Sequence, residues 1–255
     1  MSEFKFVAQT FQIRYGSADV VAALRQTAGE ATAPLHVNTL ASPTPQALTL
    51  QSATGSTRVR VERDNCQGNT QYFNDFLAAD AWDLRNNYTV SKLSWLADRL
   101  GAAGAQFSLV GLTTLARLRV APQDMDAIKL ITARTFGGIG ALAQGALPYD
   151  FSVRASRSVD DLFFANLFVN WYQTRVINID PNSPPMLLEW DMELEEEGLE
   201  LRFDWNNKLG LFRGVRDWTP ERVKNAVNRV VAGTRDDYEH LREFLTEIQA
   251  VGGQE

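Results

Sequence analysis

Hydrophobic and polar positions in residues 1–120 follow periods that predict six elements in the order strand, helix, strand, strand, helix, strand. The predicted elements cover residues 4–15, 20–29, 47–63 as a hairpin, 89–101 and 106–120. This order is the split βαβ pattern of a ferredoxin-like module. Gly111, inside the last of these strands, predicts a β-bulge.

Two stretches of the same half lack a clear period. Residues 30–46 are rich in Ala, Thr, Ser and Pro and predict a long loop. Residues 67–88 hold several aromatic side chains among Asn and Asp, and predict an irregular or helical stretch that packs on the sheet. Neither stretch is expected to add a strand.

The second half of the chain is less regular. Asp124 predicts the start of a helix that leads into the glycine-rich sequence FGGIGALAQG. Residues 151–179 contain a helix-capping signal but also a β-favouring run of Phe, Val, Trp and Tyr, and a strand is favoured. Residues 187–215 predict a three-stranded meander with turns at Glu196 to Gly198 and at Asn206–Asn207.

The last helical stretch has a strong start signal, with Thr219 as N-cap and Pro220 at the first helical position. Gly233 and Thr234 predict a break that divides it into two helices. The pattern as a whole predicts an α+β protein of two antiparallel-sheet modules, the first ferredoxin-like (βαββαβ) and the second a β-meander with C-terminal helices.

The predicted domain organisation follows from these patterns. Residues 1–121 form the ferredoxin-like module, residues 122–150 a helix and glycine-rich linker, and residues 151–255 the second sheet with its helices. A tandem of related modules fits this division, although the similarity between the halves is too low to identify a repeat.

Composition is that of an ordinary globular protein, since 45% of the 255 residues are apolar and 22% are charged. No apolar run approaches the roughly 20 residues that a spanning helix needs, and the N-terminal residues lack the features of a signal peptide. Cys66 is the only cysteine, which excludes an intramolecular disulfide. These features predict a cytoplasmic protein that does not enter a membrane.

The net charge of −6 is unevenly distributed. Residues 1–120 carry 11 Lys and Arg against 9 Asp and Glu, and residues 121–255 carry 14 against 22. The halves are therefore expected to present different surfaces or to meet different partners. The chain lacks the overall basic excess typical of nucleic-acid-binding proteins, but its sequence still allows a local basic surface.

Few motifs in the chain carry chemistry. Gly138 to Ala143 matches the G-x-G-x-x-A spacing of dinucleotide-binding turns, but it follows a predicted helix, and a loop or linker is the better interpretation. P-loop, zincin and α/β-hydrolase signatures are absent from the sequence. His36 and His240 are the only histidines, which leaves little for zinc. The sequence contains the residue types for a Cys66–His36 nucleophilic pair, but no catalytic set, metal or cofactor is predicted.

Acidic residues at every second position predict one charged strand face in the meander. They are Glu189, Asp191, Glu193 and Glu195, with Asp204 on the neighbouring strand. Such a row can bind a divalent cation, but a solvated sheet face is the simpler interpretation. In either case the face is strongly acidic, and it is predicted to bind a basic partner.

Arginines predict a second candidate surface, on the first module. The candidates are Arg58, Arg60 and Arg63 on the hairpin, Arg117 and Arg119 on the closing strand, and His36 in the long loop. If the two strands are neighbours, these arginines form a basic stripe that holds phosphates, and nearby aromatic residues stack bases. The alternative is an ordinary exposed face.

Aromatic residues between Phe163 and Tyr172 are typical of a core, although some fit an interface. Asn166 and Asn170 lie within this run and need hydrogen-bond partners if they are buried.

Function is predicted mainly from the missing catalytic motifs and the charge split. They favour a non-enzymatic cytosolic subunit that acts in protein interaction or assembly, with a protein partner or a homodimer formed through exposed sheet or the last helix. The first alternative is an RNA-binding or RNA-processing protein that uses the basic sheet face. The second is a small-molecule enzyme with a pocket between the sheets.

The predicted module order resembles that of the paired ferredoxin-like CRISPR endoribonucleases at the level of fold. The resemblance implies RNA processing with a loop histidine, which here is His36. The chain departs from that family because it lacks the glycine-rich C-terminal loop and the basic charge.

Overall fold

The computed structural model describes residues 5–16, 19–27, 37–44, 47–52, 57–72, 82–119, 152–176, 192–216 and 218–252. Its strands are β1 (Lys5–Tyr15), β2 (Val37–Thr44), β3 (Ala47–Ser52), β4 (Thr57–Glu62), β5 (Asn65–Gln71), β6 (Phe107–Arg119), β7 (Ser152–Val159), β8 (Phe163–Val176) and β9 (Glu193–Asn206). Its helices are α1 (Val20–Thr27), α2 (Trp82–Ala102), α5 (Lys208–Phe212) and α6 (Pro220–Gly252).

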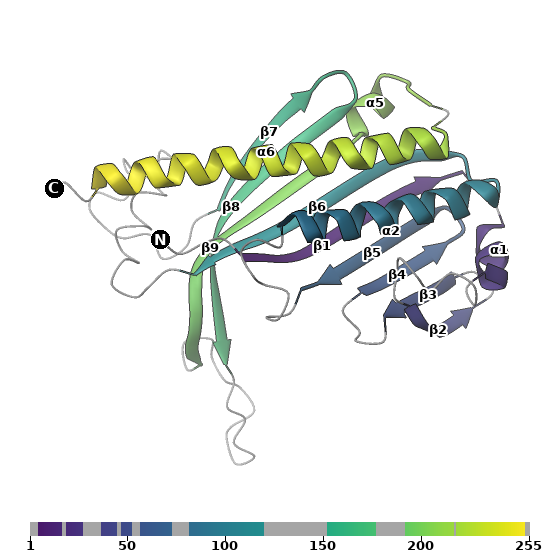
Figure 1. The fold of residues 1–255 in the computed structure, drawn as a ribbon, viewed down its shortest axis with the longest axis horizontal. Helices are drawn as coiled ribbons and strands as arrows, with labels where there is room; N and C mark the ends of the chain where they lie inside the picture. Colours follow the sequence, from purple (N-terminus) through teal and green to yellow (C-terminus); the bar gives the residue numbers. More distant parts are fainter. Residues whose placement is uncertain are drawn as a thin grey trace, which may run out of the picture.

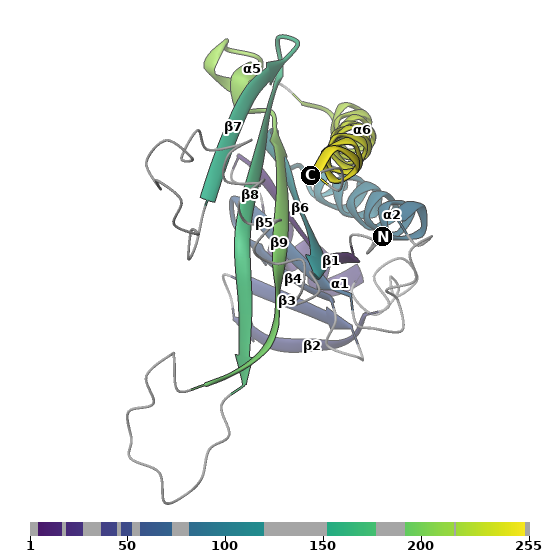
Figure 2. The same cartoon turned by 90° about the vertical axis from the view of Figure 1, so that its left-hand side faces the viewer.

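These strands form one antiparallel sheet in the order β2-β3-β4-β5-β1-β6-β9-β8-β7. Helices α2 and α6 lie side by side on one face of this sheet (Figures 1 and 2), and α1 packs against β3, β4 and α2. None of these three helices lies on the opposite face, which we call the open face. The described part of the molecule therefore has two layers, sheet and helices.

The single sheet corrects the predicted fold class. Strand β6 pairs with β9 over the register from Gly111–Asn206 to Arg119–Gly198, and this pairing joins the two predicted modules. The protein is α+β, but the ferredoxin-like order is not observed, because β2 and β5 add to the strands predicted for the first half. Separate folding of residues 1–121 and 151–255 stays a prediction, and residues 122–150 lie outside the described part.

Strand β5 shows why the prediction missed it. Its buried positions hold Cys66, Gly68 and Thr70, which are small or polar and give no hydrophobic alternation. Gly68 is needed there, because a Cβ atom would overlap the ring of Phe11 on β1. Strand β2 likewise lies within the predicted loop.

Helix α2 and strand β6 differ from prediction in detail. Helix α2 begins at Trp82, before the predicted cap Thr89, which lies buried inside the helix. The predicted bulge at Gly111 is wrong, because the β1–β6 register is continuous there. The irregularities in this pairing lie between Phe6 and Ala8 and between Arg14 and Tyr15.

The strand favoured for residues 151–179 is confirmed as β7 and β8, but the meander is wrong in two places. Strand β9 runs through the predicted turn, where the buried Glu197 carboxylate accepts hydrogen bonds from Trp171 Nε1 (3.1 Å) and Gln173 Nε2 (2.8 Å). The sequence LGLFRGV, predicted as a strand, contains helix α5.

The start of α6 is confirmed, since the Arg222 N–H donates to Thr219 Oγ1 (3.2 Å). The predicted break at Gly233 is wrong, and α6 continues for 33 residues. A Cβ atom at Gly233 would overlap the Trp205 ring, so glycine here allows close packing of the helix on β9.

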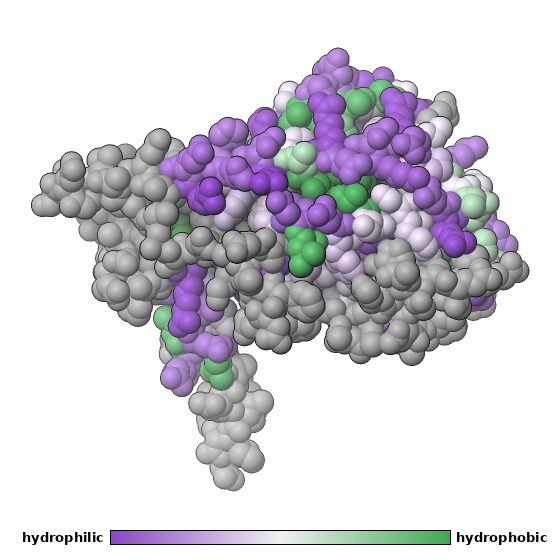
Figure 3. All heavy atoms as spheres, in the orientation of Figure 1, coloured by the Kyte–Doolittle hydropathy of each residue, from purple (hydrophilic) through white to green (hydrophobic). Residues whose placement is uncertain are grey.

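The core lies between the sheet and the helices. One apolar cluster is formed beneath α1, α2 and α6 and includes Ile13, Val59 and Leu96. A second is formed under the later turns of α6 and includes Phe203 and Leu241. Figure 3 shows the same side from outside, with hydrophilic residues along α6 and hydrophobic ones between α6 and α2.

Candidate functional site

The predicted arginines lie on one face of the sheet but not on neighbouring strands. Arg58 and Arg60 are exposed on β4, and Arg117 and Arg119 lie on β6. Strands β5 and β1 separate them, a distance of about 14 Å at the usual strand spacing. Arg63 is exposed in the turn between β4 and β5. The predicted arginines therefore form two separate groups on the sheet surface, and not the single stripe expected on adjacent strands.

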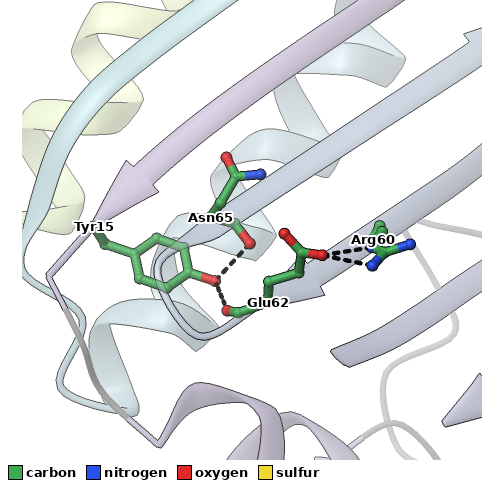
Figure 4. Close-up of polar contacts among 4 residues, drawn as sticks. All are labelled: Tyr15, Arg60, Glu62 and Asn65. Atoms are coloured by element: carbon green, nitrogen blue, oxygen red, sulfur yellow. Dashed lines mark hydrogen bonds and ion pairs between the residues drawn. The ribbon is translucent and has the colours of Figure 1, made fainter. Parts of the chain in front are cut away.

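Two of these arginines have carboxylate partners. Arg60 pairs with Glu62 at 2.7 Å, next to a turn where the Tyr15 hydroxyl donates to the main-chain oxygen of Glu62 (2.7 Å) and lies 3.1 Å from that of Asn65 (Figure 4). Arg117 pairs with Glu200 on β9 at 2.8 Å. These pairs fix the two guanidinium groups and partly neutralise them.

The centre of the open face is a row of polar residues at matched register positions. The row crosses seven strands and contains Arg58, Asn69, Thr10, Thr113, Asp204, Asn166 and Ser156. Hydrogen bonds link its second half, from Ser156 Oγ to Asn166 Oδ1 (2.7 Å) and from Asn166 Nδ2 to Asp204 Oδ2 (3.1 Å). The side chain of buried Asn166 is therefore hydrogen-bonded, as expected for a buried amide.

Arginines stack on the aromatic rings that β8 presents to the open face. The Phe168 ring lies 3.9 Å from the Arg202 guanidinium carbon and 5.2 Å from that of Arg154. Tyr172 lies 4.6 Å from that of Arg117. Stacking on a ring face leaves the N–H edge of a guanidinium able to donate, and among these arginines Arg117 donates to Glu200 while Arg154 donates to Ser156 and Asn166. Sequence reasoning missed Arg154 and Arg202, although each alternates with residues that face the helices.

The described part of the open face has more arginines than carboxylates. The arginines are Arg14, Arg58, Arg60, Arg117, Arg119, Arg154 and Arg202, and the carboxylates are Glu62, Glu193, Glu196, Glu200 and Asp204. Arg58 and Arg202 have no carboxylate within ion-pair distance among the described residues. A locally basic surface is therefore present on a chain with a net charge of −6.

A pocket of about 220 Å³ opens on the same face, between β1, β6, β9 and the start of α5. Its polar lining includes Gln12, Gln67, Thr113, Asp204, Asn206 and Lys208. Gly111 is also part of the lining, and its missing side chain leaves space between Gln12 and Asn206, its register partners on either side. The pocket adds a concave site to this face.

The helix-covered face contains a buried polar layer under the first half of α2, which the sequence did not predict. Gln9 is central, because its Nε2 donates to Asn86 Oδ1 and to Thr114 Oγ1, both at 3.2 Å. Its Oε1 accepts from the hydroxyls of Tyr72 (3.2 Å) and Thr89. Burial raises the pKa of Tyr72 to about 12.

Two cations are buried in this layer. Arg85 donates from Nη1 to the Phe6 main-chain oxygen (2.9 Å), and its Nε and Nη2 have no partner in the described part of the chain. Lys92 is 1% exposed, donates to Thr70 Oγ1 and lies 4.3 Å from the Tyr88 ring centre. Burial lowers the pKa of Lys92 to about 7.

Some of the other predicted site residues lie within the described structure, and the rest lie outside it. Glu193 and Glu195 are exposed on β9, whereas Glu189, Asp191, His36 and the G-x-G-x-x-A segment lie outside it. Cys66 is fully buried, and burial raises the pKa of its thiol, which disfavours the thiolate.

Groups of three or more metal-ligating side chains are absent from the residues that the structure describes. Within those residues, no helix combines the length and apolar character needed to cross a membrane. No protein-family model matches the chain.

Proposed function

We propose that this is a binding protein whose open sheet face binds single-stranded nucleic acid. The observation that carries the proposal is the set of arginines on this face, three of which stack on aromatic rings of β8. The predicted cytoplasmic location and the non-enzymatic role stay part of the proposal. It develops the RNA-binding alternative and not the favoured protein-assembly role.

The polar character of the face supports nucleic acid over a protein partner. Protein–protein interfaces are built around a desolvated apolar or aromatic centre. On the open face the central rows hold amides, hydroxyls and arginines, and the two Phe rings of β8 are only partly exposed. Interfaces with nucleic acids are more polar and more positively charged, which matches this surface.

The stacked arginines support a role in phosphate binding. Phosphate groups accept two parallel hydrogen bonds from a guanidinium edge. Arg202 and Arg58 present such edges at the surface without a carboxylate partner in the described residues, whereas Arg154 donates from Nε to Ser156 Oγ (3.2 Å) and from Nη2 to Asn166 Oδ1 (3.1 Å). Since β4 and β7 are six strand spacings apart, the arginines span roughly 29 Å, which suits an extended strand better than a compact ligand.

The test compares two double variants of the full chain for binding to a mixed-sequence single-stranded oligonucleotide, measured by fluorescence anisotropy over a salt series. Arg58→Ala with Arg202→Ala removes two contacts. It should weaken binding and lower the magnitude of the log K–log salt slope by about 1.4. Arg222→Ala with Arg235→Ala removes the same charge from exposed positions on α6 and should change little.

Equal loss in both double variants would show a charge effect without a site and would reject the open face. No binding by the parent protein at low salt would reject the function itself. Circular dichroism on each variant excludes unfolding as the cause.

One observation favours assembly as a second candidate. Among the described strands β7 pairs only with β8, and most of its residues are exposed. An exposed edge strand is a template for pairing with another chain. A dimer whose fraction rises with concentration in sedimentation velocity would support this reading, and a monomer at all concentrations would reject homodimer formation.

A further inference from the structure

The pocket on the open face contains two opposite charges that do not neutralise each other. Asp204 and Lys208 both line it, yet they form no ion pair, and neither has another ion-pair partner among the described residues. Asp204 is held instead by neutral donors, Asn166 Nδ2 (3.1 Å), Asn206 Nδ2 (3.4 Å) and Thr113 Oγ1 (3.5 Å). Its carboxylate is therefore positioned. The contacts from Asn206 and Thr113 are longer than normal hydrogen bonds, so both oxygens can accept a shorter hydrogen bond from a ligand in their place.

The remaining lining combines further hydrogen-bonding groups with the apolar residues Phe11 and Leu109. Gln12 Nε2 donates to Asn65 Oδ1 (3.1 Å), which leaves its carbonyl oxygen free to accept. The Lys208 main-chain N–H donates to Asn206 Oδ1 (3.3 Å) and fixes the start of α5 beside the pocket. The pocket thus offers the two carboxylate oxygens of Asp204 as acceptors and the ammonium group of Lys208 as a donor.

We propose that this pocket binds one unpaired guanine base, with the Asp204 carboxylate accepting its N1–H and N2–H groups and Lys208 donating to its O6. The inference rests on the proposed function, because the surrounding arginines hold the phosphates that flank the base. Recognition of splayed bases by their Watson–Crick edges is the usual route to sequence preference on single strands.

The hydrogen-bonding pattern excludes the other three bases. Guanine alone presents two adjacent donors, which a carboxylate accepts in parallel, beside an acceptor. Adenine, cytosine and uracil each place an acceptor where Asp204 would need a donor, and an unpaired buried acceptor carries a desolvation cost. The volume of about 220 Å³ accommodates a single base.

Gly111 supplies an independent way to test the pocket. A Cβ atom there would lie 3.4 Å from Asn206 Cβ and 3.5 Å from the Trp205 main-chain oxygen, which is ordinary contact. Gly111→Val therefore fills the pocket while leaving the strand intact, and a β-branched residue suits a strand position. Asp204→Asn keeps the size of the side chain but replaces an acceptor oxygen by a donor.

The experiment measures binding of GMP, AMP, CMP and UMP to the full chain by calorimetry, alongside the oligonucleotide assay above. GMP should bind about tenfold or more tightly than the others, and both Asp204→Asn and Gly111→Val should remove that preference. Glu243→Gln, which changes an exposed carboxylate on α6 away from the open face, should leave it unchanged.

The outcomes separate this inference from the proposed function. Salt-sensitive oligonucleotide binding with equal affinity for all four nucleotides would overturn the guanine pocket and leave the sheet-face function standing. GMP preference without oligonucleotide binding would retain the pocket and reject the wider function. A GMP preference that survives both pocket variants would place guanine elsewhere and also overturn the inference.

Discussion

The two faces of the sheet differ residue by residue along the same strands. On β9, Leu201, Phe203 and Trp205 are buried against α6, while Arg202 and Asp204 between them face the open side. The first set provides the burial that stabilises the fold. The second set contributes little to packing, so its chemistry is available for binding. One face of strand β9 thus contributes to the core, and its other face contributes to the candidate binding site.

The largest effect is expected from replacing two phenylalanines on adjacent strands, one on each face of the sheet. Phe203 on β9 is fully buried under α6, whereas Phe168 on β8, the register partner of Arg202, is partly exposed on the open face. Phe203→Ala should lower the free energy of unfolding by about 3–5 kcal/mol. Phe168→Ala should cost much less, because its ring is not enclosed.

Urea denaturation monitored by tryptophan fluorescence measures both values. Similar losses in the two variants would mean that the open face is packed like the core, and the division into a structural and a binding face would be wrong.

A smaller effect concerns Lys92, the buried cation on the helix-covered face. Its pKa is about 7 in the folded protein, against about 10.4 for an unfolded chain. Between these values the unfolded chain binds more protons, so the free energy of unfolding rises with pH, by up to about 1.4 kcal/mol per unit. Below pH 7 both states are charged and the full cost of burial is present.

Lys92→Met should remove this rise and stabilise the protein at neutral pH, whereas the exposed Lys208→Met should keep the parental profile. Thermal unfolding between pH 6 and 9 provides the comparison. Identical profiles for the parent and Lys92→Met would contradict the buried, unpaired state of this lysine.

Regular alternation explains what the sequence could predict of the fold. The hairpin β3–β4 and strand β6 have apolar residues at every second position, and Thr219 with Pro220 marks the start of α6. Strand β5 was missed because polar and small residues occupy its inner positions, where they meet the polar layer under α2. Gly233 was misread because glycine permits close packing as well as breaks.

The candidate site was predicted only in part, for a related reason. Alternation correctly separates Arg58 and Arg60 from the core side of β4, but it cannot reveal strand order. The separation of β4 from β6, and the approach of Arg202 to Phe168, depend on pairings between distant segments. The pocket depends on Gly111, Asp204 and Lys208, which come together only in the folded sheet.

Arginine labelling with phenylglyoxal, with and without a bound single-stranded oligonucleotide, tests the central claim most directly. Mass spectrometry reports the modification of each arginine separately. The account predicts that bound oligonucleotide protects Arg58, Arg154 and Arg202 on the open face, while Arg222 and Arg235 on α6 stay fully reactive. Protection of the α6 arginines with no change on the open face would contradict it.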